Sequence, residues 1–136
     1  MSNSYLIDFD VKGDERGSLI ALENGKNLPF SMQRVYYIFG TQADIRRGYH
    51  AHRALKQVLV CTSGSCQILL DNGISKHTVT LKSPTHGLYI EGLIWHEMFD
   101  FSADCVLMVL ASELYDEADY VRDYADFLSE IESNHG

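Results

Sequence analysis

The chain has 136 residues, of which 46% are hydrophobic and 22% are charged. This length suits one domain with a single hydrophobic core, and this composition is typical of globular proteins. The formal net charge of −8 argues against a nucleic acid or an anionic membrane surface as a partner, and we expect neither. We therefore predict a single domain over residues 1–136.

The N-terminal sequence gives no sign of export. It lacks the basic start and apolar stretch of a signal peptide, and no run of the chain approaches the length of a membrane span. The cysteines Cys61, Cys66 and Cys105 all lie in apolar runs. We expect them to be buried, reduced thiols rather than disulfides or metal thiolates, in a cytoplasmic protein.

The first strong strand signal is RVYYIFG, residues 34–40, which is rich in β-branched and aromatic residues. Alternate residues of a strand point to the same face, so Arg34, Tyr36 and Ile38 are expected to share one face. Arg34 and Tyr36 are therefore candidates to line one cavity. Tyr37 points to the other face, and we expect it to be structural.

The next segment, RRGYHAHRALKQV over residues 46–58, carries two histidines one residue apart. On a strand, His50 and His52 point to the same face, and Gly48 ahead of them suits a bend or a close backbone approach. A lone histidine on an apolar face is most often a core residue, but a pair flanked by arginines indicates a functional site. Because imidazole takes and returns protons around neutral pH, we predict acid–base catalysis by this pair.

Further β-rich segments follow, at residues 57–64, 65–73, 75–81, 87–92 and 104–112. Ser63-Gly64 and Asn72-Gly73 between them have the composition of two-residue hairpin turns. Turns at intervals of about eight to twelve residues predict an antiparallel sandwich or barrel. Several segments are apolar at successive positions, so we expect cover on both faces, from a second sheet inside and from another subunit outside.

His96 follows the single tryptophan, Trp95, in the segment GLIWHEM. Gly-x-His-x-His with a distant third histidine is the metal signature of cupins, but here Lys56 takes the place of the carboxylate. An ammonium group repels a divalent cation, and on a strand Glu97 would point away from the face that holds His96. We therefore predict no metal and no cofactor, and we expect Trp95 in the core.

The C-terminal segment, residues 119–133, has a helical pattern. Its apolar residues recur at helical spacing at Tyr120, Tyr124, Phe127, Leu128 and Ile131. We predict a short amphipathic helix that packs on the barrel and has no functional role.

Four segments carry a resemblance to a known family. They are RVYYIFG, RRGYHAHRALKQVLVC-x-SGSC, GLYI-x-GLIWHEM and DCVLMVLAS-x-LYDEADYVRDY-x-DFL, and the likeness runs from DERGSLIALE to the tail. Together they resemble the nucleotide-sugar 3,4-ketoisomerases. The resemblance implies an all-β fold, a metal-free cupin jelly-roll barrel with a short C-terminal helix, and a homodimer with exchanged N-terminal strands.

The resemblance also implies an activity. Members of the family act on dTDP-4-keto-6-deoxyglucose in bacterial surface-polysaccharide pathways, and they move the keto group from C4 to C3 through an enediol. His50 would be the base that removes the C3 proton, and His52 would orient the substrate or relay a proton between oxygens. The product would then be aminated to a 3-amino-3,6-dideoxyhexose.

The substrate's diphosphate needs cations. Guanidinium groups bind phosphate oxygens in a bidentate manner, so Arg34, Arg46 and Arg47 are candidates, and Tyr36 is a candidate to hydrogen-bond a sugar oxygen.

Two further positions bear on the stereochemistry at C4. The resemblance associates Arg16, in the RGSL segment, and His96 with the branch of the family that forms the galacto product. The gluco branch would carry Tyr and Arg at these positions.

Alternative functions remain open on the sequence. A gluco-type ketoisomerase and a non-catalytic cupin that binds a nucleotide sugar would carry similar residues. A 3,5-epimerase would pair its histidine base with an aspartate from another segment, and the sequence does not reveal one. A metal oxygenase would require a bound transition metal.

Overall fold

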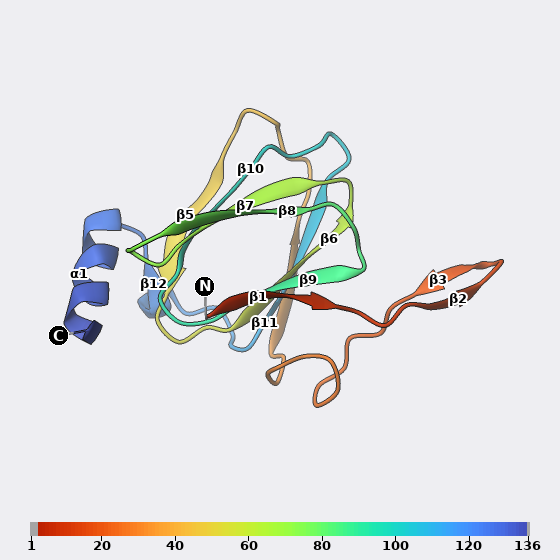
Figure 1. Cartoon of the computed structure of the whole chain (residues 1–136), viewed down its shortest axis with the longest axis horizontal. Coiled ribbons are helices and arrows are strands. Elements are labelled where there is room, and N and C mark those ends of the chain that lie inside the picture. The colour runs from red at the N-terminus through yellow and green to blue at the C-terminus, as the bar shows by residue number, and fades with distance from the viewer. Residues whose placement is uncertain (1–2, 136) are drawn as a thin grey trace.

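The computed structural model describes residues 3–135 as two facing five-stranded sheets, a small hairpin and a C-terminal helix (Figure 1). The first sheet has the order β1 (Ser4–Asp8), β9 (His86–Ile90), β6 (Gln57–Ser63), β11 (Val106–Ala111) and β4 (Arg34–Ile38). The second has the order β12 (Tyr120–Val121), β5 (Arg47–His52), β10 (Trp95–Phe99), β7 (Cys66–Asp71) and β8 (Lys76–Leu81). Neighbouring strands in both sheets pair antiparallel, which confirms the predicted cupin jelly roll.

The main hydrophobic core fills the space between the two sheets. Leu59 and Leu107 enter it from the first sheet, and Ile68 and Met98 enter it from the second. Burial of an aliphatic side chain of this size stabilises the fold by about 1.5–3 kcal/mol. This core fixes the distance between the sheets and therefore the space available for a site at the end of the barrel.

Strand β6 is covered on both faces, as its unbroken apolar sequence predicts. Leu59 points into the barrel, whereas Val58 and Val60 point outward and are also buried. The outer cover comes from the chain itself: Phe9 and Leu28 pack there, together with Ile20, Leu22, Phe30 and Met32. The expectation that another subunit provides this cover is therefore wrong for β6.

The helix α1 (Tyr124–His135) packs on the outer face of the second sheet at one end, over β5, β10 and β12, as the sequence predicts. Phe127 is fully buried against Trp95 and Val121, so Trp95 is a core residue as expected. The Tyr124 hydroxyl donates a hydrogen bond of 2.6 Å to Asp71 at the end of β7. These contacts hold the C-terminal segment against β5 and β10.

The two predicted hairpin turns behave differently. Asn72-Gly73 does connect paired strands, β7 and β8, although the loop extends to Ser75. Ser63-Gly64 connects β6 in the first sheet to β7 in the second, so the prediction of a hairpin there is wrong. Gly64 has φ +67°, which favours glycine in either kind of turn, so turn composition does not reveal which strands pair.

A small hairpin stands apart from the barrel. It consists of β2 (Lys12–Asp14) and β3 (Gly17–Leu19), and it projects on the side opposite α1 (Figure 1). Every residue of both strands is exposed. Within residues 3–135, no helix has the length and apolar character needed to cross a bilayer.

Candidate active site

Three histidine rings meet at the end of the barrel where β5 and β10 pair. The ring centroid of His50 lies 5.0 Å from that of His52 and 4.6 Å from that of His96. His50 and His96 are direct partners across the ladder, and both His52 and His96 are buried. The predicted placement of His50 and His52 on one face is confirmed, and His96 joins them.

A local irregularity in β5 makes this arrangement possible. The register between β5 and β10 shifts after His96, where Gly48 has φ +95° and Tyr49 has φ +60°. A Cβ atom on Gly48 would lie 2.9 Å from the carbonyl oxygen of His96. Glycine is therefore required both for the backbone angle and for the close approach of the strands, as the sequence indicates.

Hydrogen bonds fix the same tautomer in all three neutral rings. The Nδ1 atom of His50 lies 3.1 Å from the Gly48 carbonyl oxygen, and that of His96 lies 3.2 Å from the Ile94 carbonyl oxygen. Carbonyl oxygens only accept hydrogen bonds, so in both rings Nδ1 carries the proton and donates it. The free lone pair is then on Nε2, which is the atom available to remove a proton.

The environment also keeps the three rings neutral. Burial lowers the pKa of His50, and burial together with the neighbouring imidazoles lowers the pKa of His96 well below its usual value. Burial, followed by the nearby His50, lowers the pKa of His52 to about 3. At neutral pH the cluster therefore offers uncharged bases.

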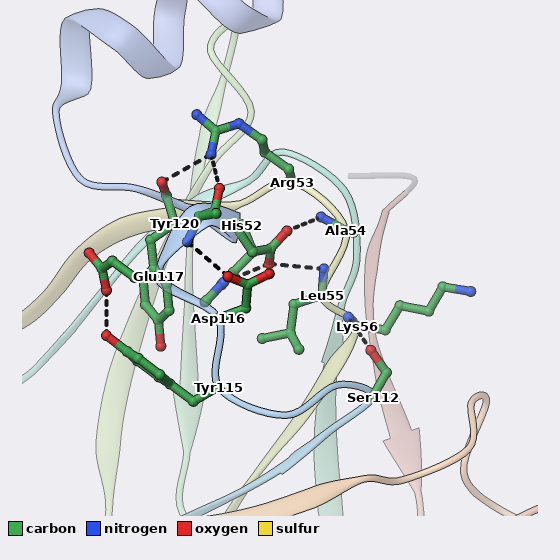
Figure 2. A network of polar contacts seen from close by, with 12 residues as sticks. His52, Arg53, Ala54, Leu55, Lys56, Ser112, Tyr115, Asp116, Glu117 and Tyr120 are labelled. Atoms are coloured by element: carbon green, nitrogen blue, oxygen red, sulfur yellow. Dashed lines mark hydrogen bonds and ion pairs between the residues drawn. The ribbon is translucent and has the colours of Figure 1, made fainter.

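Asp119 orients the third ring, His52. Its Oδ2 atom lies 3.2 Å from Nδ1 of His52, and the same carboxylate accepts hydrogen bonds from the backbone amides of Ala54 and Leu55, at 2.7 and 3.3 Å. Figure 2 shows His52 within this network, with Ala54 and Leu55 beside it. This half-buried carboxylate against Nδ1 holds the ring in the same tautomer as in His50 and His96, with Nε2 free.

The segment that carries Asp119 is held in place by Arg53. The Arg53 guanidinium donates to the carbonyl oxygens of Ala118 and Tyr120, at 2.6 and 3.2 Å, and it forms an ion pair with Glu130 on α1 (Figure 2 shows the bonds to the segment). Arg53, one of the arginines that flank the histidine pair, is therefore structural here.

Tyr120 closes the site beside the histidines. Its ring centroid lies 4.3 Å from that of His52 and 5.2 Å from that of His50, and the Arg122 guanidinium lies 4.2 Å from the Tyr120 ring. Tyr120 belongs to strand β12, not to a helix, and α1 begins at Tyr124. The prediction of a helix from residue 119 is therefore wrong for residues 119–123.

One sequence signal marks the true start of the helix. The side chain of Asp123 accepts a hydrogen bond from the backbone amide of Asp126, as an N-cap residue does. An aspartate before a helical pattern predicts that the helix begins after it, which leaves Tyr120 and Val121 free to form a strand.

Two cavities of about 620 and 540 Å³ open beside the histidines. The larger is lined by His52 and Asp119, and the smaller by His50 and Arg47; Arg34 and Tyr120 line both. The two cavities share Arg34 and Tyr120, and each has a volume sufficient for a sugar and a phosphate group.

Arg34 and Tyr36 share a face of β4, as predicted from their spacing. Tyr36 lines the smaller cavity, and burial raises the pKa of its hydroxyl to about 12, so it stays protonated and able to donate. The Arg34 guanidinium lies 5.2 Å from the Tyr36 ring.

The predicted residues Arg46 and Arg16 lie elsewhere in the protomer. Arg46 pairs with Glu97 at 2.8 Å and stacks 3.9 Å from the Phe99 ring, and it is not among the residues lining either cavity. Arg16 pairs with Asp14 in the projecting hairpin, where 85% of its side chain is exposed. The protomer alone therefore brings neither arginine to the histidines.

The histidine cluster also has the geometry of a metal site. One nitrogen from each ring lies within 4.8 Å of the other two, and the Nε2 atoms would be the ligands, because Nδ1 of each ring is already hydrogen-bonded. Lys56 does not oppose this, since its side chain points away from His52 (Figure 2). The prediction of a metal-free site therefore rests on the resemblance and stays a prediction.

A family model described as "FdtA: WxcM-like, C-terminal" matches residues 2–132. A TDP-4-oxo-6-deoxy-alpha-D-glucose-3,4-oxoisomerase from Aneurinibacillus thermoaerophilus is 56% identical over 122 residues, which cover 90% of this chain and 88% of that protein. The chain belongs to this family of 3,4-ketoisomerases.

Solved structures of the family have the same architecture. A variant of the 3,4-ketoisomerase QdtA from Thermoanaerobacterium thermosaccharolyticum, in complex with TDP-4-keto-6-deoxyglucose, superposes with a TM-score of 0.95 at 44% identity, over 98% of this chain and 96% of that one. The TDP-quinovose 3,4-ketoisomerase WlaRB from Campylobacter jejuni superposes with a TM-score of 0.91 at 47% identity, over 95% of this chain and 99% of that one.

Proposed function

We propose that this 3,4-ketoisomerase converts dTDP-4-keto-6-deoxy-D-glucose to dTDP-3-keto-6-deoxy-D-galactose. Removal of the proton at C3 gives an enediolate across C3 and C4. The O3 proton passes to O4, and a proton is returned to C4, so that the keto group moves without any net gain or loss of atoms or electrons. The observation that supports this chemistry best is the cluster of neutral imidazoles whose Nε2 atoms are free.

His50 is the base in this proposal. Its Nδ1 is hydrogen-bonded to Gly48, it lines the smaller cavity, and burial lowers its pKa, so a neutral Nε2 is available to remove the C3 proton. His52 lines the larger cavity and is held by Asp119, which suits a relay of protons between O3 and O4.

The diphosphate is assigned to the arginines beside the histidines. Arg34 and Arg47 line the smaller cavity, and the hydroxyl of Tyr36 is placed to donate to a sugar oxygen. Arg46 remains a candidate phosphate ligand. In this role its guanidinium would have to leave Glu97 and bind the diphosphate instead.

The galacto configuration of the product is proposed from Arg16 and His96. His96 packs against the base His50, at the point where protonation at C4 would be controlled. Arg16 reaches a site only if the projecting hairpin enters a second protomer, so this part of the proposal depends on a homodimer with exchanged N-terminal strands. The replacement of Arg16 by Tyr together with His96 by Arg is expected to shift the product toward the gluco epimer.

Exposed apolar side chains support the homodimer. Leu19 on the hairpin is 59% exposed, and Val35 and Tyr37 on the edge strand β4 are 46% and 63% exposed. A strand edge with apolar side chains is a surface that pairs with another chain. Sedimentation equilibrium is expected to give twice the mass of the chain, and a monomer with full activity would remove the proposed role of Arg16.

The test of the activity is incubation with dTDP-4-keto-6-deoxyglucose, followed by NMR of the sugar. A 3-keto product with the galacto configuration at C4 supports the proposal. An unchanged spectrum indicates a non-catalytic binder, and exchange at C3 and C5 without a 3-keto product indicates an epimerase.

The proposed reaction uses no metal or other cofactor. Elemental analysis of the purified protein is expected to find no stoichiometric transition metal, and activity is expected to survive prolonged dialysis against EDTA. Loss of activity on dialysis, restored by one metal ion, would show that the three histidines act as ligands. We place the enzyme in the cytoplasm, before an aminotransferase that forms a 3-amino-3,6-dideoxyhexose for a surface polysaccharide.

A further inference from the structure

A second cluster of ligand atoms lies away from the histidines. Cys61 on β6, Cys66 at the start of β7 and Cys105 just before β11 place their three sulfur atoms within 4.8 Å of one another. Their exposed fractions are 0%, 1% and 2%, and the three are free thiols. The cluster joins the two sheets, because β6 belongs to the first and β7 to the second.

The cluster is separate from the active site. Leu70 is the β7 partner of His96, and Cys66 lies four residues from Leu70 along the same strand. At a rise of about 3.3 Å per residue this is a separation of about 13 Å along β7. A ligand at the sulfur cluster would therefore leave the histidine rings and both cavities in place.

We propose that Cys61, Cys66 and Cys105 form a binding site for a three-coordinate thiophilic centre, with trivalent arsenic as the chemical type that fits it. The donor set consists of three sulfur atoms whose mutual distances allow all of them to bind one small atom. Soft thiolate ligands select soft acceptors. A structural zinc ion almost always takes four ligands, and the cluster within residues 3–135 provides three.

The charge of the bound form points to a trivalent centre. The three cysteines belong to a hydrophobic cluster that includes Leu59, Leu81 and Phe101, and the Cys61 thiol also contacts the uncharged carbonyl oxygens of Ser63 and Gly64. A charged complex buried among them is costly, and three thiolates on a monovalent or divalent ion leave a net negative charge. Three thiolates on As(III) give a neutral complex, so this centre avoids the cost.

The binding reaction is a balanced condensation. Arsenous acid, As(OH)₃, exchanges its three hydroxyl groups for the three cysteine sulfurs, and each thiol proton leaves with one hydroxyl as water. Three As–O bonds and three S–H bonds break, three As–S bonds and three O–H bonds of water form, and arsenic stays trivalent. No oxidant, reductant or other reactant is needed.

We expect access to the cluster to open at the loop before β11. The Cys61 thiol donates to the carbonyl oxygens of Ser63 and Gly64, at 3.2 and 3.4 Å, in the turn that links the two sheets. Ser102 and Asp104 lie beside Gly64, so that a Cβ atom there would clash with both, and Asp104 is exposed. An opening of residues 100–105 would uncover the sulfur atoms, so we expect arsenite to bind slowly compared with a surface dithiol.

The test uses the purified full chain and arsenite. X-ray absorption at the arsenic edge is expected to show three As–S bonds and no As–O bond in the folded protein, at one arsenic per chain. The temperature of thermal unfolding is expected to rise, because the arsenic atom links the two sheets. Arsenic bound by fewer than three sulfur atoms, or bound only in denaturant, would overturn the proposal.

Single variants make the test specific. Cys61→Ala, Cys66→Ala and Cys105→Ala are each expected to weaken arsenite binding by about 10²-fold or more, because the third thiol binds intramolecularly at a high effective concentration. His50→Asn is the matched control and is expected to bind arsenite as the wild type does. Unchanged affinity in a folded cysteine variant, checked by its thermal unfolding, would also overturn the proposal, as would displacement of arsenic by equimolar zinc.

Discussion

The two ends of the barrel each hold three side chains that can bind a proton or an ion, but they differ in their neighbours. Each histidine has its Nδ1 atom hydrogen-bonded, to Gly48, Ile94 or Asp119, and the rings border two cavities. The cysteines are enclosed by apolar side chains and border neither cavity. One ring nitrogen fixed by a hydrogen bond and open space beside the ring make the histidines the candidate catalytic cluster. The cysteines border no cavity, which suits a core or a closed binding site.

The largest expected effect comes from His50, the proposed base. His50→Asn is expected to lower kcat by about 10²–10⁴-fold, because general-base catalysis is lost, while the affinity for TDP stays the same. Steady-state kinetics and calorimetric titration with TDP measure the two quantities. A near-normal kcat in this variant would show that His50 is not the base.

A smaller loss is expected when the orientation of His52 is removed. Asp119→Asn replaces the carboxylate that accepts a hydrogen bond from Nδ1 of His52. We expect kcat to fall by roughly 10–100-fold with KM little changed, as is typical when a group that orients a functional histidine is removed. The pH profile should also change, which a purely structural defect would not cause. Asp126→Asn, an exposed aspartate on α1, is the matched control and should behave as the wild type.

The pH dependence follows from the lowered pKa values of the histidines. Protonation inactivates a base, so activity is lost as the pH falls through the pKa of the folded protein. Because burial lowers that pKa in His50, the acid limb of kcat/KM should lie below the usual histidine value of about 6.5. Initial rates from pH 5 to 8 in constant ionic strength test this, and an acid limb at or above 6.5 would contradict the neutral cluster.

The smallest effect is expected at the other end of the barrel. Cys105→Ala removes a buried sulfur atom and should lower the free energy of unfolding by about 1 kcal/mol, with kcat unchanged. Urea denaturation and steady-state kinetics of the same preparation measure both. A loss of kcat comparable to that of Asp119→Asn would remove the distinction between the two clusters.

Local patterns in the sequence predict β4, β6, β7, β8, β9, β11 and the placement of the histidine pair, but they do not predict β1. The alternation of Arg34, Tyr36 and Ile38, and the spacing of His50 and His52, depend on strand geometry alone, which one sequence reveals. Gly48 also predicts a bend or a close backbone approach, because few other backbone conformations require glycine.

Features that depend on distant pairing could not be predicted in the same way. Asp119 meets His52 only because β12 pairs with β5, and Tyr120 fits a helical spacing as well as a strand. Ser63-Gly64 has the same composition in a turn between sheets as in a hairpin. Arg16 was assigned by resemblance, and its distance from the protomer's own site requires a partner chain to explain any role there.

The most direct test of the central claim, that neutral His50 removes the C3 proton, is hydrogen exchange in D₂O. Wild-type enzyme with dTDP-4-keto-6-deoxyglucose should yield a 3-keto product with deuterium at C4, and His50→Asn should leave the C3 hydrogen in place, as followed by NMR. Exchange at C3 by His50→Asn at the wild-type rate would contradict the account.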